Sequence, residues 1–393
     1  MAHAYSLLIY GKIISDVVYR EGYQEAIRRV VKPGDVVLDL GSGTGFMGLI
    51  ACQAGARRVY AVEPAYIIQM AKELAAANGY ADRVEFIQAL STQITLPEPV
   101  NVIVSDLHGA LPFFEAGIRA IIDARRRFLA PGGTLIPRRE ILWVAVAEAP
   151  DLYQGFVAPW KDNPYGLNLA PALQLTTHFW ERAQIKPTQL LVAPEIWSTL
   201  DYSTLESPHV KGELDWRMAR RGTGHGLVIW FDADLAPGVG FSVAPGSPTN
   251  IYTQGFFPWT EPVDLAEGDR VTVSLAANLV EDNYIWRWDT HIRDAGGQVK
   301  ANFRQSTFNT FLESPARLQQ RSADHVPTLT RDGQIARFIM EMMDGKASLG
   351  DIARRLVAEF PDRFAGDKEA LTRAGELSLK YGRPLDRKYL REP

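Results

Sequence analysis

Cysteine and long apolar runs are scarce in this sequence. Cys52 is the single cysteine among 393 residues, which excludes an internal disulfide framework and a cysteine-rich zinc site. One cysteine is typical of a reducing compartment, so we expect a cytoplasmic protein. The best apolar run, residues 141–147, is far shorter than the ~20 residues of a membrane-spanning helix. Residues 1–10 lack a basic region and a small-residue cleavage signature, so we expect no signal peptide and no membrane partner.

An excess of charge of one sign is also missing. The 42 Lys and Arg residues against 46 Asp and Glu residues give a net charge of −4, which argues against a generally basic nucleic-acid-binding protein. Hydrophobic residues make up 46% and charged residues 22%, which excludes disordered and coiled-coil compositions. At roughly 100–200 residues per domain, the length predicts two or three domains. We predict no nucleic-acid partner and no metal site.

The first part of the chain alternates between two patterns. Continuous apolar runs of strand length, such as residues 36–40, 59–62 and 100–104, are separated by segments with helical spacing. Strands and helices in this order favour right-handed crossovers and a parallel sheet covered on both faces. We therefore predict an α/β domain with a doubly wound, Rossmann-like sheet over residues 1–148.

The pattern changes twice further along the chain. Period-two apolar stretches predict an antiparallel β domain, a barrel or a sandwich, which we place at residues 149–320 as a β-barrel-like substrate domain. Its less regular part, about residues 160–186, is expected to form an arm. Helical spacing returns after about residue 320, where Ser348 and Asp351 have the spacing of a capping box. We predict a small helical domain over residues 321–393.

A glycine-rich segment follows the first predicted strand. It reads Asp39-Leu40-Gly41-Ser42-Gly43-Thr44-Gly45, and glycines there bring the backbone close to a ligand at a helix N-terminus. Glu63 ends the next strand, where a carboxylate can accept both hydroxyls of a ribose. The two features together predict a nucleoside-containing cofactor. The alternative interpretation is a glycine turn with an incidental acid.

The register of the glycines distinguishes between cofactors. A dinucleotide fingerprint starts at the end of the strand, and reading from Gly41 gives G-x-G-x-G. This pattern after Asp39 resembles motif I of class I S-adenosylmethionine-dependent methyltransferases. Residues 36–45, 54–63 and 128–137 are similar to the protein arginine N-methyltransferases, and the resemblance covers about residues 5–295.

The resemblance implies an activity, a cofactor and partners. It implies transfer of a methyl group (EC 2.1.1) from S-adenosylmethionine to an arginine nitrogen in a protein or peptide. The order of domains, a cofactor fold and then a β-barrel, also fits this family, and the resemblance implies a homodimer. Arg20 is carried over from the family's cofactor-covering helix, although it is displaced by one position. The expected cofactor-binding residues are Asp39, Gly41, Ser42, Gly43, Thr44, Gly45, Glu63, Pro64, Thr92 and Arg20.

The segment Ser105–Glu115 resembles the double-glutamate loop of that family, S-E-x-x-G-x-x-x-x-x-E, with Asp106 in place of the first glutamate. The resemblance implies that Asp106 and Glu115 are catalytic residues that clamp the guanidinium. A guanidinium stays charged at neutral pH, so paired carboxylates can orient it. The alternatives are a cofactor-side or loop-capping role for Asp106 and an ordinary helix N-terminal acid for Glu115.

His108 lies in this loop at a position where the family has no basic residue. The family also has a Thr-His-Trp loop, and in this sequence Ile251 occupies the position of its histidine. His108 as a catalytic general base would favour a non-arginine acceptor, either a small molecule or a peptide. The other interpretation is a hydrogen-bonded loop histidine.

The last part of the chain suggests a further possibility for the substrate. Residues 326–361 resemble PqqD-like winged-helix domains, which implies a ribosomally made peptide as substrate. The alternative for this segment is a structural helical cap. A catalytically idle peptide-binding protein is the alternative function from another class.

Overall fold

In the computed structural model, which describes residues 5–162, 164–311 and 314–383, the apolar run Val36–Leu40 forms strand β1. β1 pairs in parallel with β2 (Arg58–Val62) and β4 (Val100–Ser105), and all its residues are buried. With β3 (Val84–Ile87) and β5 (Leu129–Ile136), the sheet has the order β3-β2-β1-β4-β5. The predicted doubly wound, Rossmann-like sheet is confirmed.

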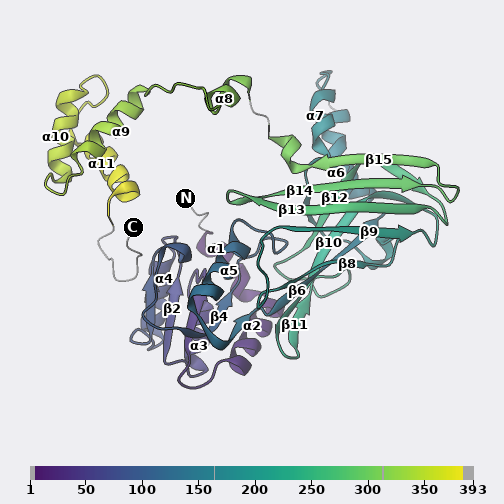
Figure 1. Cartoon of the computed structure of the whole chain (residues 1–393), viewed down its shortest axis with the longest axis horizontal. Helices are drawn as coiled ribbons and strands as arrows, with labels where there is room; N and C mark the ends of the chain where they lie inside the picture. Colours follow the sequence, from purple (N-terminus) through teal and green to yellow (C-terminus); the bar gives the residue numbers. More distant parts are fainter. Residues whose placement is uncertain (1–4, 163, 312–313, 384–393) are drawn as a thin grey trace. The chain divides into compact units, whose positions relative to one another are not determined.

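Helices pack against this sheet (Figure 1). They are α2 (Val17–Val30), α3 (Phe46–Gln53), α4 (Ile68–Ala77) and α5 (Gly117–Phe128), while α1 (Leu7–Ser15) precedes α2 and the 3-10 turn η1 (Ser91–Gln93) follows β3. Asp16 separates α1 from α2, because its side chain accepts a hydrogen bond from the Tyr19 N–H and caps α2. The strand order reverses between β1 and β4, so the carboxyl ends of these strands are where a ligand is expected.

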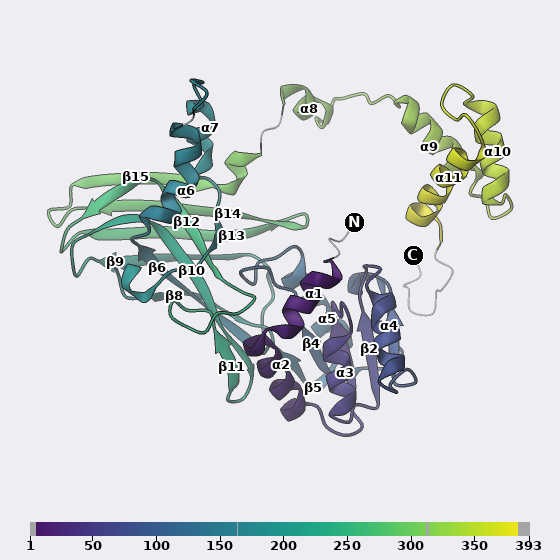
Figure 2. The same ribbon diagram turned by 180° about the vertical axis from the view of Figure 1, so that it is seen from behind.

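Two antiparallel sheets follow in the chain (Figure 2). The first has the order β7-β12-β10-β6-β8, with β11 paired to β10, and the second has the order β15-β14-β13-β9. Their strands are β6 (Arg139–Ala147), β7 (Glu181–Ala183), β8 (Glu195–Asp201), β9 (Val210–Arg217), β10 (Gly222–Ala236), β11 (Val239–Ser242), β12 (Gln254–Leu265), β13 (Arg270–Val280), β14 (Asn283–Arg293) and β15 (Val299–Ser306).

The predicted period-two pattern appears in these strands. In β13, Val271, Val273 and Leu275 are fully buried and alternate with more exposed residues. The buried indole of Trp288 donates a hydrogen bond from Nε1 to the carbonyl of Pro258, which joins the second sheet to the first. The predicted antiparallel β-sheet fold of this part is therefore confirmed, in the form of two sheets that share buried aromatic residues.

Two helices lie in and just before residues 160–186, the segment that was expected to form an arm. α6 (Pro150–Lys161) begins with a proline in its first turn, and α7 (Ala170–Thr176) follows it. The Thr176 hydroxyl donates a hydrogen bond to the Phe156 carbonyl and so ties the two helices together. α7 stands out from the antiparallel sheets (Figures 1 and 2), whereas α6 packs against them through Phe156, whose ring meets Phe256 of β12. The 3-10 turns η2 (Pro187–Gln189) and η3 (Thr307–Thr310) lie before β8 and after β15.

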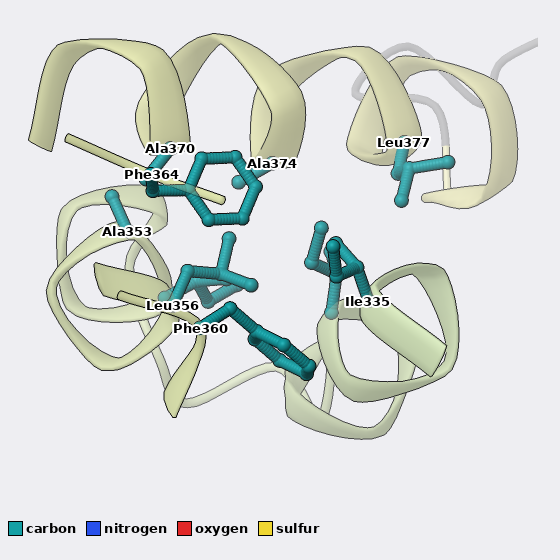
Figure 3. Packing of buried hydrophobic residues seen from close by; sticks show 10 residues of the cluster. Ile335, Ala353, Leu356, Phe360, Phe364, Ala370, Ala374 and Leu377 are labelled. Atoms are coloured by element: carbon teal, nitrogen blue, oxygen red, sulfur yellow. The ribbon is translucent and has the colours of Figure 1, made fainter. Parts of the chain in front are cut away.

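The described residues fall into two compact units, one up to residue 311 and the other over residues 314–383, so the parallel and antiparallel sheets belong to one unit. The second unit contains α8 (Pro315–Gln320), α9 (Arg331–Met342), α10 (Leu349–Glu359) and α11 (Asp367–Tyr381). The capping box expected from Ser348 and Asp351 is present at the start of α10. Figure 3 shows the apolar cluster between α9, α10 and α11, with Leu356 and Phe360 near its centre.

Replacing Leu356 with alanine should destabilise the second unit by about 2–5 kcal/mol, because Leu356 is fully buried in this cluster. Hydrogen exchange of the full-length protein, followed in peptides from residues 331–381, measures the change. The matched control is Leu379→Ala, since Leu379 is 80% exposed and its truncation should cost less than about 0.5 kcal/mol. Equal protection in both variants would contradict this assignment of the core.

Candidate active site

A cavity of about 580 Å³ lies at the carboxyl ends of the parallel strands. The loops after β1, β2, β3 and β4 all contribute to its wall, and α1 supplies Tyr10 and Lys12. Tyr252, in the loop before β12, closes another side. The cavity therefore occupies the place that the reversal of strand order predicts for a ligand.

The glycine-rich loop after β1 forms the floor of this cavity. Gly41 and Gly43 have φ values of +75° and +51°, in the left-handed region that favours glycine. A Cβ atom on Gly41 would lie 2.5 Å from Leu107, and one on Gly43 would lie 2.6 Å from Tyr10. Only glycine therefore fits at these two positions without a shift of neighbouring side chains. The backbone approaches the cavity as closely as the sequence predicted.

Asp39, in β1, connects the glycine-rich loop to the helix α3 that follows it. Its Oδ2 atom accepts a 2.8 Å hydrogen bond from the Gly48 N–H in α3, and the residue is 1% exposed. Burial raises the pKa of Asp39 to about 7, although the Gly48 N–H lowers it. Gly45, which the sequence also assigned to the cofactor, is the N-cap of α3 and does not line the cavity.

Glu63 presents its carboxylate to the cavity at the end of β2. Its Oε2 atom accepts a hydrogen bond from the Gly43 N–H at 3.1 Å, and its Oε1 atom accepts one from the Ala65 N–H at 2.8 Å. Burial raises the pKa of Glu63, and these two N–H groups oppose the rise. Each oxygen keeps a lone pair for a further donor, so the carboxylate can accept both hydroxyls of a ribose.

Other polar groups of the wall fit a nucleoside-containing cofactor as well. The Ser42 hydroxyl is buried and has no hydrogen-bond partner in the described part of the chain, so it can serve a ligand. Ser42, Thr44 and Pro64 line the cavity as expected. Among the described residues, His, Cys, Asp and Glu side chains form no group of three or more that could hold a metal ion.

Two residues assigned to the cofactor from the sequence lie elsewhere. Thr92 is exposed, and its neighbour Ser91 lines the cavity instead, because the η1 turn points Ser91 inwards. Arg20 forms an ion pair with Glu21 at 3.4 Å and does not line the cavity. The cation of the α1–α2 segment that lines the cavity is Lys12.

Acidic residues of the loop after β4 form the other end of the cavity. Asp106 and Glu115 both line it, which brings together the two carboxylates of the predicted clamp. The Asp106 Oδ1 atom accepts a 2.5 Å hydrogen bond from the Tyr252 hydroxyl and lies 2.7 Å from His108 Nδ1. The two carboxylate oxygens of Glu115 have no hydrogen-bond partner within the described ranges. The backbone of Glu115 has a φ of +43°.

His108 lies between two carboxylates. Its Nδ1 atom is 2.7 Å from Asp106 Oδ1, and its Nε2 atom is 2.7 Å from Glu140 Oε1. Glu140 is fully buried in β6, and its Oε2 atom accepts a 2.6 Å hydrogen bond from the Tyr202 hydroxyl. Burial alone would lower the pKa of His108, but Glu140 and Asp106 raise it to about 10.

A role of His108 as a general base stays a prediction, and this arrangement does not favour it. A base needs a free nitrogen lone pair, and both ring nitrogens of His108 face carboxylates and carry protons at neutral pH. The sequence analysis missed Glu140 and Tyr202. A lone glutamate directly before the apolar run 141–147 was the available signal, since a charged residue inside a buried strand needs a partner.

Comparisons with known proteins agree with this architecture. Residues 37–133 match the family "Methyltransferase domain", and residues 138–290 match the "Arginine methyltransferase oligomerization subdomain". A probable protein arginine N-methyltransferase 6 of Arabidopsis thaliana is 32% identical over 60% of this chain and 56% of its own length. Protein arginine N-methyltransferase 2 of Homo sapiens is 32% identical over 64% of this chain and 61% of its own length. The chain thus spans less than two thirds of these two relatives.

Solved structures show the same fold. The enzyme–prozyme complex of a Trypanosoma brucei arginine methyltransferase has a TM-score of 0.69 at 22% identity, over 76% of this chain and 96% of that chain. Protein arginine methyltransferase 10 of Arabidopsis thaliana has a TM-score of 0.68 at 24% identity, over 77% and 97%. The resemblance predicted from the sequence is confirmed. Among the described helices, none is both long and apolar enough to cross a membrane.

Proposed function

We propose that this chain, in which a methyltransferase domain precedes the oligomerization subdomain of the arginine methyltransferases, methylates arginine side chains in a protein or peptide. The observation that carries the proposal is a single cavity with two chemically different ends. Glu63 and the glycine loop suit the nucleoside of S-adenosylmethionine, and Asp106 and Glu115 suit a guanidinium. The placement of both ends in one cavity would bring donor and acceptor together.

The residues around Glu63 and the glycine loop would bind and orient S-adenosylmethionine. Glu63 would accept the ribose hydroxyls, the Ser42 hydroxyl would satisfy a further polar group, and Gly41 and Gly43 leave room for the ligand. When bound, S-adenosylmethionine supplies an electrophilic methyl group on a sulfonium sulfur. Holding donor and acceptor in line contributes most of the rate in such a displacement.

The acidic end holds the acceptor. A guanidinium is charged at any physiological pH, so the carboxylates of Glu115 and Asp106 can bind it through two parallel N–H groups and direct one nitrogen towards the methyl group. With S-adenosylmethionine bound, Asp106 and Glu115 would hold the guanidinium as it takes the methyl group, and the proton that the methylated nitrogen gives up would pass through one of these carboxylates to water. The negative wall of the site stabilises the positive charge that moves onto the guanidinium.

The assembly and compartment belong to the same proposal. The match of residues 138–290 to an oligomerization subdomain supports a homodimer. The single cysteine, Cys52, which is buried, supports a reducing and cytoplasmic environment. Light scattering of the purified full-length protein tests the dimer, and a monomeric mass across the concentration range would contradict it.

The activity is tested with methyl-labelled S-adenosylmethionine and two matched peptides that differ only in arginine or lysine at one position. Acid hydrolysis and identification of the labelled product should give methylarginine from the first peptide and no label from the second. Label in another amino acid or in a small molecule would instead identify a different acceptor. Tight cofactor binding without turnover on host lysate would favour an idle peptide-binding protein.

A further inference from the structure

The loop after β4 and strand β6 share a buried row of ionic groups that methyl transfer as described does not use. Asp106, His108 and Glu140 follow one another at 2.7 Å on each side of the imidazole. The side chains of His108 and Glu140 are 3% and 0% exposed. A carboxylate that is fully buried is costly unless a cation pairs with it, and no Lys or Arg contacts Glu140 within the described ranges.

We propose that His108 is a permanently charged imidazolium that fixes the Asp106 carboxylate in the acceptor pocket, and that Glu140 keeps His108 charged. The inference rests on the proposed arginine methyltransferase activity. His108 and Glu140 are positioning residues in this proposal, because they act on the acceptor only through Asp106.

Among the described residues, His108 is the one basic side chain that contacts Asp106 or Glu140. Asp106 and Glu140 face its two nitrogens, Tyr252 meets its ring edge at 5.7 Å, and Phe231 stacks on it at 5.8 Å between centroids. Tyr202 bonds to Glu140. Burial, aided by these carboxylates, raises the pKa of the phenols Tyr19, Tyr23, Tyr202 and Tyr252 well above their usual range, so all four stay neutral.

The charge balance explains why a cation is useful beside a cationic substrate. Without His108, Asp106 and Glu140 would be two negative charges in a buried place with no cation between them, which is costly. The imidazole of His108 and the hydroxyl of Tyr252 both hold Asp106 at its Oδ1 atom. Asp106 has one methylene less than a glutamate, and these two contacts limit its rotation, so its remaining lone pairs keep one direction towards the cavity.

The protonation state of His108 can be measured without any substrate. Nuclear magnetic resonance of the full-length protein with labelled histidine, with the signal assigned by its loss in His108→Asn, should show both ring nitrogens protonated at pH 8. In Glu140→Gln the same titration should move to lower pH by at least one unit, because the stronger of the two raising charges is gone. A His108 that is neutral at pH 7.5 in the wild-type protein overturns the proposal, whether or not the enzyme methylates arginine.

Kinetics distinguish positioning from a general structural role. The alkaline limb of kcat should move to lower pH by at least one unit in Glu140→Gln, while the matched control Glu213→Gln, at an exposed position of β9, keeps the wild-type profile. An unchanged alkaline limb in a folded Glu140→Gln protein contradicts the proposal. If the wild-type protein forms no methylarginine, the proposed function is wrong. The charge of His108 is then tested by the nuclear magnetic resonance titration, which needs no substrate.

A double variant separates stability from positioning. His108→Asn keeps a donor near Asp106 but leaves Glu140 unpaired, so both Tm and kcat should fall, kcat by tenfold or more. Adding Glu140→Gln removes the unpaired charge, so Tm should recover while kcat stays low. If kcat recovers together with Tm, His108 serves packing alone and the proposal is wrong.

Discussion

Glu115→Gln is expected to lower kcat for arginine methylation by at least about 100-fold and to leave the affinity for S-adenosylmethionine within about twofold of wild type. The carboxylate of Glu115 lines the cavity and has no other hydrogen-bond partner within the described ranges. An amide keeps the size of the side chain but loses the charge and one acceptor oxygen, so it cannot bind two guanidinium N–H groups in parallel. Steady-state kinetics with the arginine peptide and calorimetric titration of the cofactor measure the two quantities.

The chain offers a matched control for this substitution. Glu281 also has a positive φ, +55°, and lies in the exposed turn between β13 and β14. Glu281→Gln makes the same change of charge on a similarly constrained backbone, so it should keep wild-type kcat and cofactor affinity. If the two variants have equal kcat, Glu115 does not hold the acceptor. If Glu115→Gln instead weakens the cofactor, the acidic end of the cavity has been assigned to the wrong ligand.

Glu63→Ala is expected to weaken the binding of S-adenosylmethionine by at least about 100-fold. The substitution removes an acceptor for two ribose hydroxyls, and a hydrogen bond to a charged group contributes about 1.5–3 kcal/mol, where 1.4 kcal/mol is a factor of ten. It also leaves the Gly43 and Ala65 N–H groups without their present acceptor, which loosens the glycine loop. Calorimetric titration of the purified protein with the cofactor measures the dissociation constant.

Glu73→Ala is the control for this second prediction, since Glu73 is exposed on α4 and its truncation should leave cofactor affinity unchanged. A Glu63→Ala variant that binds the cofactor like wild type would contradict the assignment of this end of the cavity. Glu63 and Glu115 line the same cavity, so the pair of variants should separate cofactor binding from acceptor turnover. Loss of both properties in both variants would indicate damage to the fold instead.

The sequence determined the features that depend on neighbouring residues. The run at β1 is apolar because its strand is buried on both faces, and the glycines that follow it are needed where φ is positive, so both can be recognised within ten residues or so of chain. The capping box at Ser348 is local in the same way. The loop that carries Asp106 and Glu115 could be identified by resemblance, because the spacing of its residues is fixed along the chain.

Tertiary structure alone decided what these residues contact. Glu140 precedes an apolar run and looks like the edge of a strand, but pairing of β6 between β8 and β10 buries it against His108 of the loop after β4. Tyr252 reaches Asp106 across 146 positions of sequence. Burial by itself would lower the pKa of His108, but the carboxylates of Glu140 and Asp106, which the fold brings to its two ring nitrogens, raise it from 6.5 to about 10. Local sequence cannot specify that environment, because it depends on which distant side chains exclude solvent.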